Sequence, residues 1–194
     1  MNFIVIDGKK LGVLIVVIGL VVFLFGIGAR FDSQIRSTSF IQSNTNTMKE
    51  FSALDNKITY KLPVRWETEI KPFNGQEILY HNNFTSDDNA IHGFVQVWNS
   101  KGDLKAFLLS SKEIAEKQNE IKDYNIKEVS VNGKSGYLVT YKMKTNGNVY
   151  YQAYEYFISD SNNFVRFSFY VLDKDFKEAM PELFKKIVNT LKNS

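Results

Sequence analysis

Apolar residues run without interruption from Leu11 to Ala29, directly after Lys9 and Lys10. As a helix, this run of 19 residues is about 28 Å long, close to the roughly 30 Å hydrocarbon core of a bilayer. The pattern therefore predicts a transmembrane helix at residues 11–29 behind a short N-terminal tail at residues 1–10, with the lipid bilayer as its partner.

The alternative for an apolar N-terminus is a cleaved signal peptide, for which Gly26 and Gly28 supply small residues near a cleavage site. We favour the uncleaved anchor, because the run exceeds the 7 to 15 residues typical of a signal core. The basic residues do not decide orientation, since the two lysines before the run are matched by Arg30 and Arg36 after it. The short tail favours a cytoplasmic N-terminus, which places the rest of the chain outside the cytoplasm.

Polar residues dominate the next segment. Residues 30–50 are rich in Ser, Thr, Asn and Gln, so we expect a flexible linker there.

From Lys57 onward, short segments of alternating polarity predict strands. These segments are Lys57–Leu62, Trp66–Lys71, Glu77–His81 and Gly93–Trp98. Residues 51–194 are expected to form one soluble domain.

A helical period follows from Leu104 to Gln118, with Asp103 in the N-cap position. Four further strands are then predicted, at Ile126–Val131, Ser135–Lys144, Val149–Ser159 and Phe164–Leu172. The pairs Asn132-Gly133 and Asn146-Gly147 separate the first three strands, and Asn-Gly between apolar runs is the strongest short hairpin signal. The third strand is apolar on both faces, which predicts a central strand covered on both sides.

An amphipathic helix ends the pattern. Apolar residues from Phe176 to Leu191 keep helical spacing, and Pro181 lies either in the first turn or at a kink. Strands, a helix, four antiparallel strands and a helix together predict the α+β class. The expected architecture is a mainly antiparallel β-sheet flanked by two helices, an α/β/α sandwich preceded by one transmembrane helix.

Several segments resemble the PsbP/Mog1-like superfamily. They are Leu62-Pro63-Val64-Arg65-Trp66, the stretch Val131–Met143, the aromatic strand after it and the C-terminal amphipathic helix. The resemblance covers residues 51–194 and rests on structural motifs. It implies a non-enzymatic accessory or binding module, membrane-associated or exported in bacteria, with no shared catalytic site.

Charge and composition exclude two classes of function. The net charge of +3 arises within residues 1–49, and the remainder balances 19 basic and 19 acidic residues. A nucleic-acid-binding domain needs a clustered basic face, so we expect no nucleic-acid partner. The chain has no cysteine, which excludes disulfides, thiolate metal sites and a cysteine nucleophile.

The two histidines, His81 and His92, flank a segment that contains Asp87 and Asp88. This spacing matches no zinc or EF-hand pattern, and a solvated loop is the preferred interpretation over a weak divalent-metal site. We therefore assign no catalytic, cofactor-binding or metal-ligating residue, and expect no cofactor and no enzyme.

Three further features are interpreted as structural. Arg166 lies inside an apolar strand and either points outward or, as we favour, pairs with an acid such as Glu155 on the neighbouring strand. The aromatic strand's tyrosines are expected to pack under the helices rather than bind a ligand. Trp66 is expected to anchor the turn after Pro63.

The sequence thus favours a membrane-anchored module outside a bacterial cytoplasm that binds a protein partner of unknown identity. A small-ligand-binding domain with an apolar pocket between sheet and helix is one alternative. A carboxylate-based envelope enzyme using Asp87 and Asp88 is the other.

Overall fold

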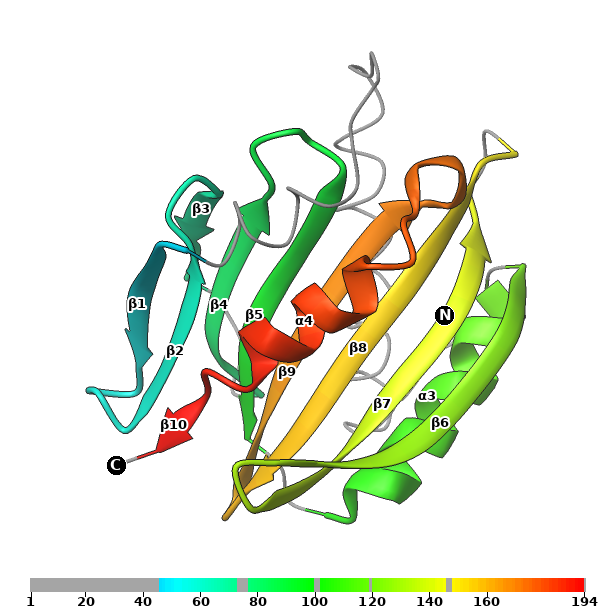
Figure 1. The fold of residues 1–194 in the computed structure, drawn as a ribbon. Coiled ribbons are helices and arrows are strands. Elements are labelled where there is room, and N and C mark those ends of the chain that lie inside the picture. Colours follow the sequence, from blue (N-terminus) through cyan, green and yellow to red (C-terminus); the bar gives the residue numbers. More distant parts are fainter. Residues whose placement is uncertain (1–45, 73–76, 100–101, 119, 146–147, 194) are drawn as a thin grey trace, which may run out of the picture.

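The computed structural model describes residues 46–72, 77–99, 102–118, 120–145 and 148–193. A seven-stranded antiparallel sheet has the order β3-β4-β5-β9-β8-β7-β6 (Figure 1). Its strands are β3 (Glu67–Ile70), β4 (Ile78–Thr85), β5 (Ile91–Asn99), β6 (Ile121–Val131), β7 (Lys134–Lys144), β8 (Tyr150–Asp160) and β9 (Asn163–Leu172). The predicted α+β class with a mainly antiparallel sheet is confirmed.

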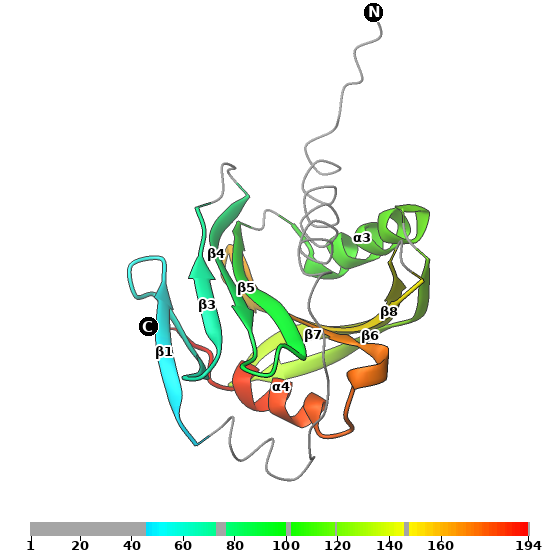
Figure 2. The ribbon, with the colours of Figure 1, turned by 90° about the horizontal axis from the view of Figure 1, so that it is seen from above.

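Helices cover both faces of this sheet. Helix α3 (Leu104–Gln118) lies on one face and α4 (Met180–Val188) on the other (Figure 2). A second sheet has the order β1-β2-β10 and consists of β1 (Met48–Ala53), β2 (Ile58–Pro63) and β10 (Lys192–Asn193). The apolar side chains of β2 pack with those of α4 in one core cluster, so the small sheet extends the layer on the α4 side.

Two apolar clusters lie on opposite faces of the large sheet. The cluster on the α4 side includes Tyr156 and Ile158 of β8, and the cluster on the α3 side includes Ala153 and Phe157 of the same strand. Side chains alternate between faces along a strand, so both faces of β8 are buried. This confirms the prediction of a central strand covered on both sides.

The folded region begins earlier than the sequence pattern predicts. Strand β1 starts at Met48, inside the range expected to be linker, and pairs antiparallel with β2. Its Phe51 ring stacks on Tyr60, with 5.5 Å between ring centroids. Residues 48–50 are therefore strand and not linker, because a partner distant from the polar segment stabilises them.

Strand β4 continues through Thr85, four residues beyond its predicted end at His81. The polar residues that obscured it form side-chain hydrogen bonds inside the fold. Asn82 is fully buried, and its amide donates to the Tyr60 hydroxyl at 2.7 Å. A buried amide with a partner is tolerated in a core strand, and alternation of polarity does not reveal it.

One turn prediction is confirmed, one of the two alternatives for Pro181 is selected, and the last helix is shorter than predicted, since it begins at Met180 rather than near Phe176. Asn132 and Gly133 have φ values of 50° and 80°, as a type I′ turn requires. Pro181 lies in the first turn of α4. That helix ends at Val188 rather than Leu191, because Thr190 instead accepts a hydrogen bond from the Lys61 amide of β2 at 2.8 Å.

The predicted tail, the predicted membrane span Leu11–Ala29 and the Asn146-Gly147 turn lie outside the described residues, as does most of the predicted linker. Within the part of the chain that the structure describes, no helix has the length and apolar character needed to cross a bilayer.

Candidate functional site

A buried ion pair lies at the centre of the α3-facing side of the sheet. Arg166 on β9 donates from Nη2 to Glu155 Oε1 on β8 at 2.6 Å. Their exposed fractions are only 1% and 4%. The prediction of a structural cross-strand pair is confirmed, because Arg166 points into the protein and not toward solvent.

Two tyrosines complete the surroundings of Glu155. The hydroxyls of Tyr141 and Tyr170 both donate to Glu155 Oε1, the former at 3.4 Å. Burial, together with the nearby Glu155 carboxylate, holds the pKa of each phenol well above its usual range. These hydroxyls therefore keep their protons and stabilise the carboxylate.

Aromatic rings enclose the guanidinium of Arg166. Its Cζ lies 4.9 Å from the ring centroid of Phe94 and 5.3 Å from that of Phe157. Its Nε and Nη1 have no hydrogen-bond partner among the described residues. Burial lowers the pKa of Arg166, but the nearby Glu155 carboxylate has the larger opposite effect. The pKa of Arg166 is therefore raised above its ordinary value. Arg166 remains a cation held by one carboxylate and two rings.

His81 extends the polar row across the sheet. Gln96 is opposite His81 on one side and opposite Arg166 on the other. Its amide lies 2.9 Å from His81 Nδ1, and it accepts a hydrogen bond from Trp98 Nε1 at 2.8 Å. Burial lowers the pKa of His81, and the Arg166 cation lowers it further. The histidine is therefore a neutral structural residue.

The loop that contains Asp87 and Asp88 is a closed turn between β4 and β5. Asp88 accepts from Ser86 Oγ at 2.6 Å and from the Ala90 amide at 3.1 Å. Asp87 forms an ion pair with Arg65 at 2.7 Å. Within the described ranges, no three acidic or histidine side chains gather as a metal would require. The acidic pair thus acts in turn geometry and surface charge.

Most of the tyrosines on β8 pack in the core. Tyr151 is 5% exposed, and Tyr154 stacks on Phe176 with 5.6 Å between centroids. Burial raises the pKa of Tyr156 to about 12. This agrees with the expectation that these tyrosines pack under the helices, with Tyr150 as the exception.

Tyr150 belongs to a surface cluster that sequence reasoning missed. Its hydroxyl donates to Glu120 at 2.7 Å, and Lys122 and Lys144 lie 3.0 and 2.9 Å from the same carboxylate. Hydrogen bonds from Lys144, Tyr150 and Lys122 lower the pKa of Glu120 to about 2. The members come from three different strands or their flanks, so no local spacing indicated them.

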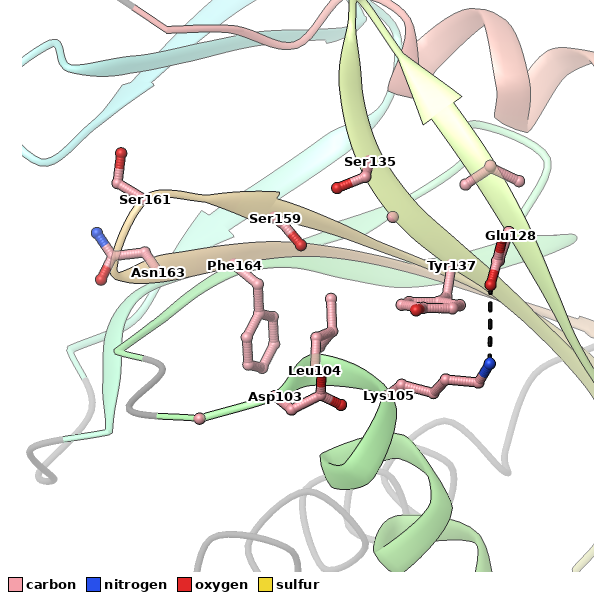
Figure 3. Close-up of a pocket in the computed structure, with 13 residues that line it drawn as sticks. Asp103, Leu104, Lys105, Glu128, Ser135, Tyr137, Ser159, Ser161, Asn163 and Phe164 are labelled. Atoms are coloured by element: carbon pink, nitrogen blue, oxygen red, sulfur yellow. Dashed lines mark ion pairs between the residues drawn. The ribbon is translucent and has the colours of Figure 1, made fainter.

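An open hollow of about 450 Å³ lies between the first turn of α3 and the adjoining ends of β6, β7, β8 and β9. We call it the polar hollow. In Figure 3, the rings of Tyr137 and Phe164 lie to either side of Leu104. Lys105 and Glu128 form an ion pair of 3.7 Å that joins α3 to β6. The remaining polar side chains that line it are Asp103, Ser135, Ser159, Ser161 and Asn163.

The polar hollow differs from the apolar pocket that the sequence suggested as an alternative. It does lie between sheet and helix, but hydroxyls, an amide and an ion pair line most of it. No signal in the sequence pointed to it, because Ser135 and Ser159 lie at the ends of strands where polar residues are ordinary.

No protein-family model matches the chain, and no curated protein sequence matches it. Solved structures are similar to it. Cyanobacterial PsbP (CyanoP) from Synechocystis superposes with a TM-score of 0.56 at 10% identity, over 87% of this chain and 99% of that one. A Bacteroides thetaiotaomicron protein gives 0.51 at 13% identity, over 75% of this chain and 48% of its own. The domain therefore has a PsbP-like fold.

LpqN, a Mycobacterium tuberculosis protein involved in cell envelope biogenesis, also aligns over 83% of this chain and 99% of its own. Its TM-score is 0.43 at 11% identity, which carries no functional argument.

Proposed function

We propose that this chain is a single-pass membrane protein of a bacterial envelope, anchored by Leu11–Ala29, whose PsbP-like domain holds a protein partner outside the cytoplasm. The observation that carries the proposal is the start of the fold at Met48. Only the 18 residues 30–47 then separate the domain from the apolar run. As a coil these residues would span roughly 23 Å, so an anchored domain would lie close to the bilayer surface.

The use of the acidic side chains supports a binding role over an enzymatic one. Asp87, Asp88 and Glu155, which sequence reasoning considered, are engaged by Arg65, a turn and Arg166 respectively. A general acid or base must be within reach of a substrate proton. Glu155 is buried, and the other two acids stabilise surface structure.

Strand β6 is the surface we assign to the partner. It is eleven residues long, ends the large sheet, and pairs with β7 alone among the described strands. Lys127 and Glu128 on it are exposed. Its register with β7 shifts between Lys122 and Asn125, so the regular part of this edge is residues 125–131. An unpaired regular edge is a template for a partner strand, with main-chain hydrogen bonds supplying affinity.

Fractionation and protease treatment of cells that express the full chain test the anchor and its topology. We expect an intact N-terminus in the membrane fraction and digestion of the domain in protoplasts without lysis. A soluble product that begins near Ala29 would contradict the anchor. Protection of the domain until lysis would contradict the topology.

A photo-crosslinking residue at Lys127 tests the partner surface in the same cells. We expect a discrete crosslinked product from this position and none from Lys185, which is exposed on α4. Equal products from both positions, or none from Lys127, would reject β6 as the partner surface.

A further inference from the structure

We propose that the polar hollow is a binding site for a neutral saccharide. The proposal is independent of the membrane anchor and of the protein partner. It rests on the size of the polar hollow, on the side chains that line it, and on the hydrogen-bonding groups that remain free there. A volume of about 450 Å³ lies within the range of roughly 300 to 1,000 Å³ found for ligand pockets.

On the side of the polar hollow formed by the sheet, serine hydroxyls lie next to aromatic rings. Ser135 and Ser159 each lie one residue beyond the last pair between β7 and β8, Gly136 and Ile158. Alternation places both serines on the α3-facing side, where Tyr137 also packs. On the next strand, Phe164 is opposite Ser159. Phe164 is buried, so the half-buried ring of Tyr137 is the one that the C–H face of a sugar can contact, and the serine hydroxyls can pair with the sugar's hydroxyl groups.

The polar groups in the polar hollow are available to a ligand. Among the described residues, the side chains of Ser135, Ser159 and Tyr137 form no hydrogen bond with the protein, whereas Figure 3 shows the side chains of Ser161 and Asn163 turned away from α3. Hydroxyls can both donate and accept. Lys105 adds donors and Glu128 adds acceptors at the same opening. This mixture suits sugar hydroxyls, which also act in both ways.

The charges disfavour an anionic ligand. The first turn of α3 is already capped, because Asp103 Oδ1 accepts from the Ala106 amide at 2.7 Å. The carboxylates of Asp103 and Glu128 repel an anion, and Lys105, the one lysine among the described residues that line the polar hollow, is paired with Glu128. A lipid chain is disfavoured as well, since it would leave the hydroxyls of Ser135 and Ser159 unsolvated.

Saturation-transfer NMR on the full chain in lipid nanodiscs tests the proposal, since glycosidic detergents would compete. The probes are chitotriose, maltotriose and cellotriose, with the neutral peptide Gly-Ser-Asn-Gly as comparison. We expect transfer to at least one trisaccharide and none to the peptide. No transfer to any trisaccharide at 10 mM, or equal transfer to the peptide, would overturn the saccharide assignment.

Variants locate the binding. Ser135→Trp introduces a ring at an exposed strand position and should abolish binding by filling the polar hollow. The double variant Ser135→Ala/Ser159→Ala should weaken affinity about tenfold by removing two hydroxyls. Ser52→Ala, exposed on β1 in the other sheet, is the matched control and should bind as the parent does. Melting temperatures within 2 °C of the parent show that each variant is folded. Binding that survives Ser135→Trp would place the saccharide elsewhere and overturn the proposal.

Discussion

Arg166 shows what a single residue requires in order to be charged inside a sheet. One carboxylate, two aromatic rings and nearly complete burial define its surroundings. Removing charges from water costs several kcal/mol per ion, and a close partner offsets this cost only while both members remain. The pair therefore constrains how β8 and β9 align, since a shift in register separates the two charges.

Glu155→Gln should lower the free energy of unfolding by about 3 to 5 kcal/mol, because it leaves the Arg166 cation buried without a counter-charge. Urea denaturation of the parent and the variant measures the difference. The double variant Glu155→Leu/Arg166→Met removes both charges and should be more stable than the single variant. A single variant as stable as the parent would show that Glu155 does not compensate Arg166.

Trp66→Ala should lower the free energy of unfolding by about 3 to 5 kcal/mol. The indole is only 4% exposed and packs on Phe84, with 5.2 Å between ring centroids, so truncation leaves a cavity at the turn after Pro63. Val64→Ala, two positions earlier and 50% exposed, is the control and should change stability by less than about 0.5 kcal/mol. Similar melting temperatures for both variants would contradict the anchoring role.

At the scale of elements, the turn between β6 and β7 depends on backbone conformation. Gly133 has a φ of +80°, which L side chains rarely adopt, whereas open space surrounds the position where its Cβ would be. Any effect of a substitution there therefore reports backbone strain and not a clash.

Gly133→Ala should lower the free energy of unfolding by about 1 kcal/mol, and Gly133→Asn should lower it less, since Asn tolerates positive φ. Thermal denaturation of the two variants gives this order. Gly102→Ala is the control, because a Cβ there also meets nothing within 4 Å and its φ is not positive. An equal loss for Ala at both glycines would exclude the turn geometry as the cause.

Elements with a clear local period could be predicted from the sequence. Strands β2, β7, β8 and β9 and helix α3 begin and end within two residues of expectation, because alternation or helical spacing runs along each. Strands β1 and β10 were not predicted. Each is stabilised by pairing with β2, which lies on the far side of a turn from β1 and over a hundred residues from β10.

The polar hollow could not be predicted for a related reason. Its serines, its rings and its ion pair come from four strands and one helix, and each is ordinary within its own segment. The Arg166–Glu155 pair was predicted because a lone charge in an apolar strand is locally conspicuous and its partner lies on the next strand.

At the scale of the whole molecule, acid should destabilise the domain through its two histidines. Burial is the main cause that lowers the pKa of both His81 and His92 below the ordinary 6.5. The unfolded chain therefore binds protons more readily than the folded one. Stability is complete above pH 6.5 and falls below it, by at most about 2.7 kcal/mol per pH unit for two protons.

Urea midpoints measured between pH 5 and pH 7.5 check this dependence. The double variant His81→Gln/His92→Gln should be less stable at pH 7.5 but should show a flatter profile. An unchanged slope in that variant would assign the acid sensitivity to other groups.

The pairing of β10 with β2 has a consequence during synthesis. Residues 58–63 leave the ribosome 130 residues before their partner near residue 193, which at roughly 5 to 20 residues per second means a wait of about 6 to 26 s. The five buried side chains of α4, which pack in the same core cluster, arrive equally late. The nascent N-terminal part of the domain cannot complete its core during that interval. Folding of the domain is therefore completed only after residue 193 has been synthesised, and until then the apolar side chains of β2 lack the α4 side chains against which they pack.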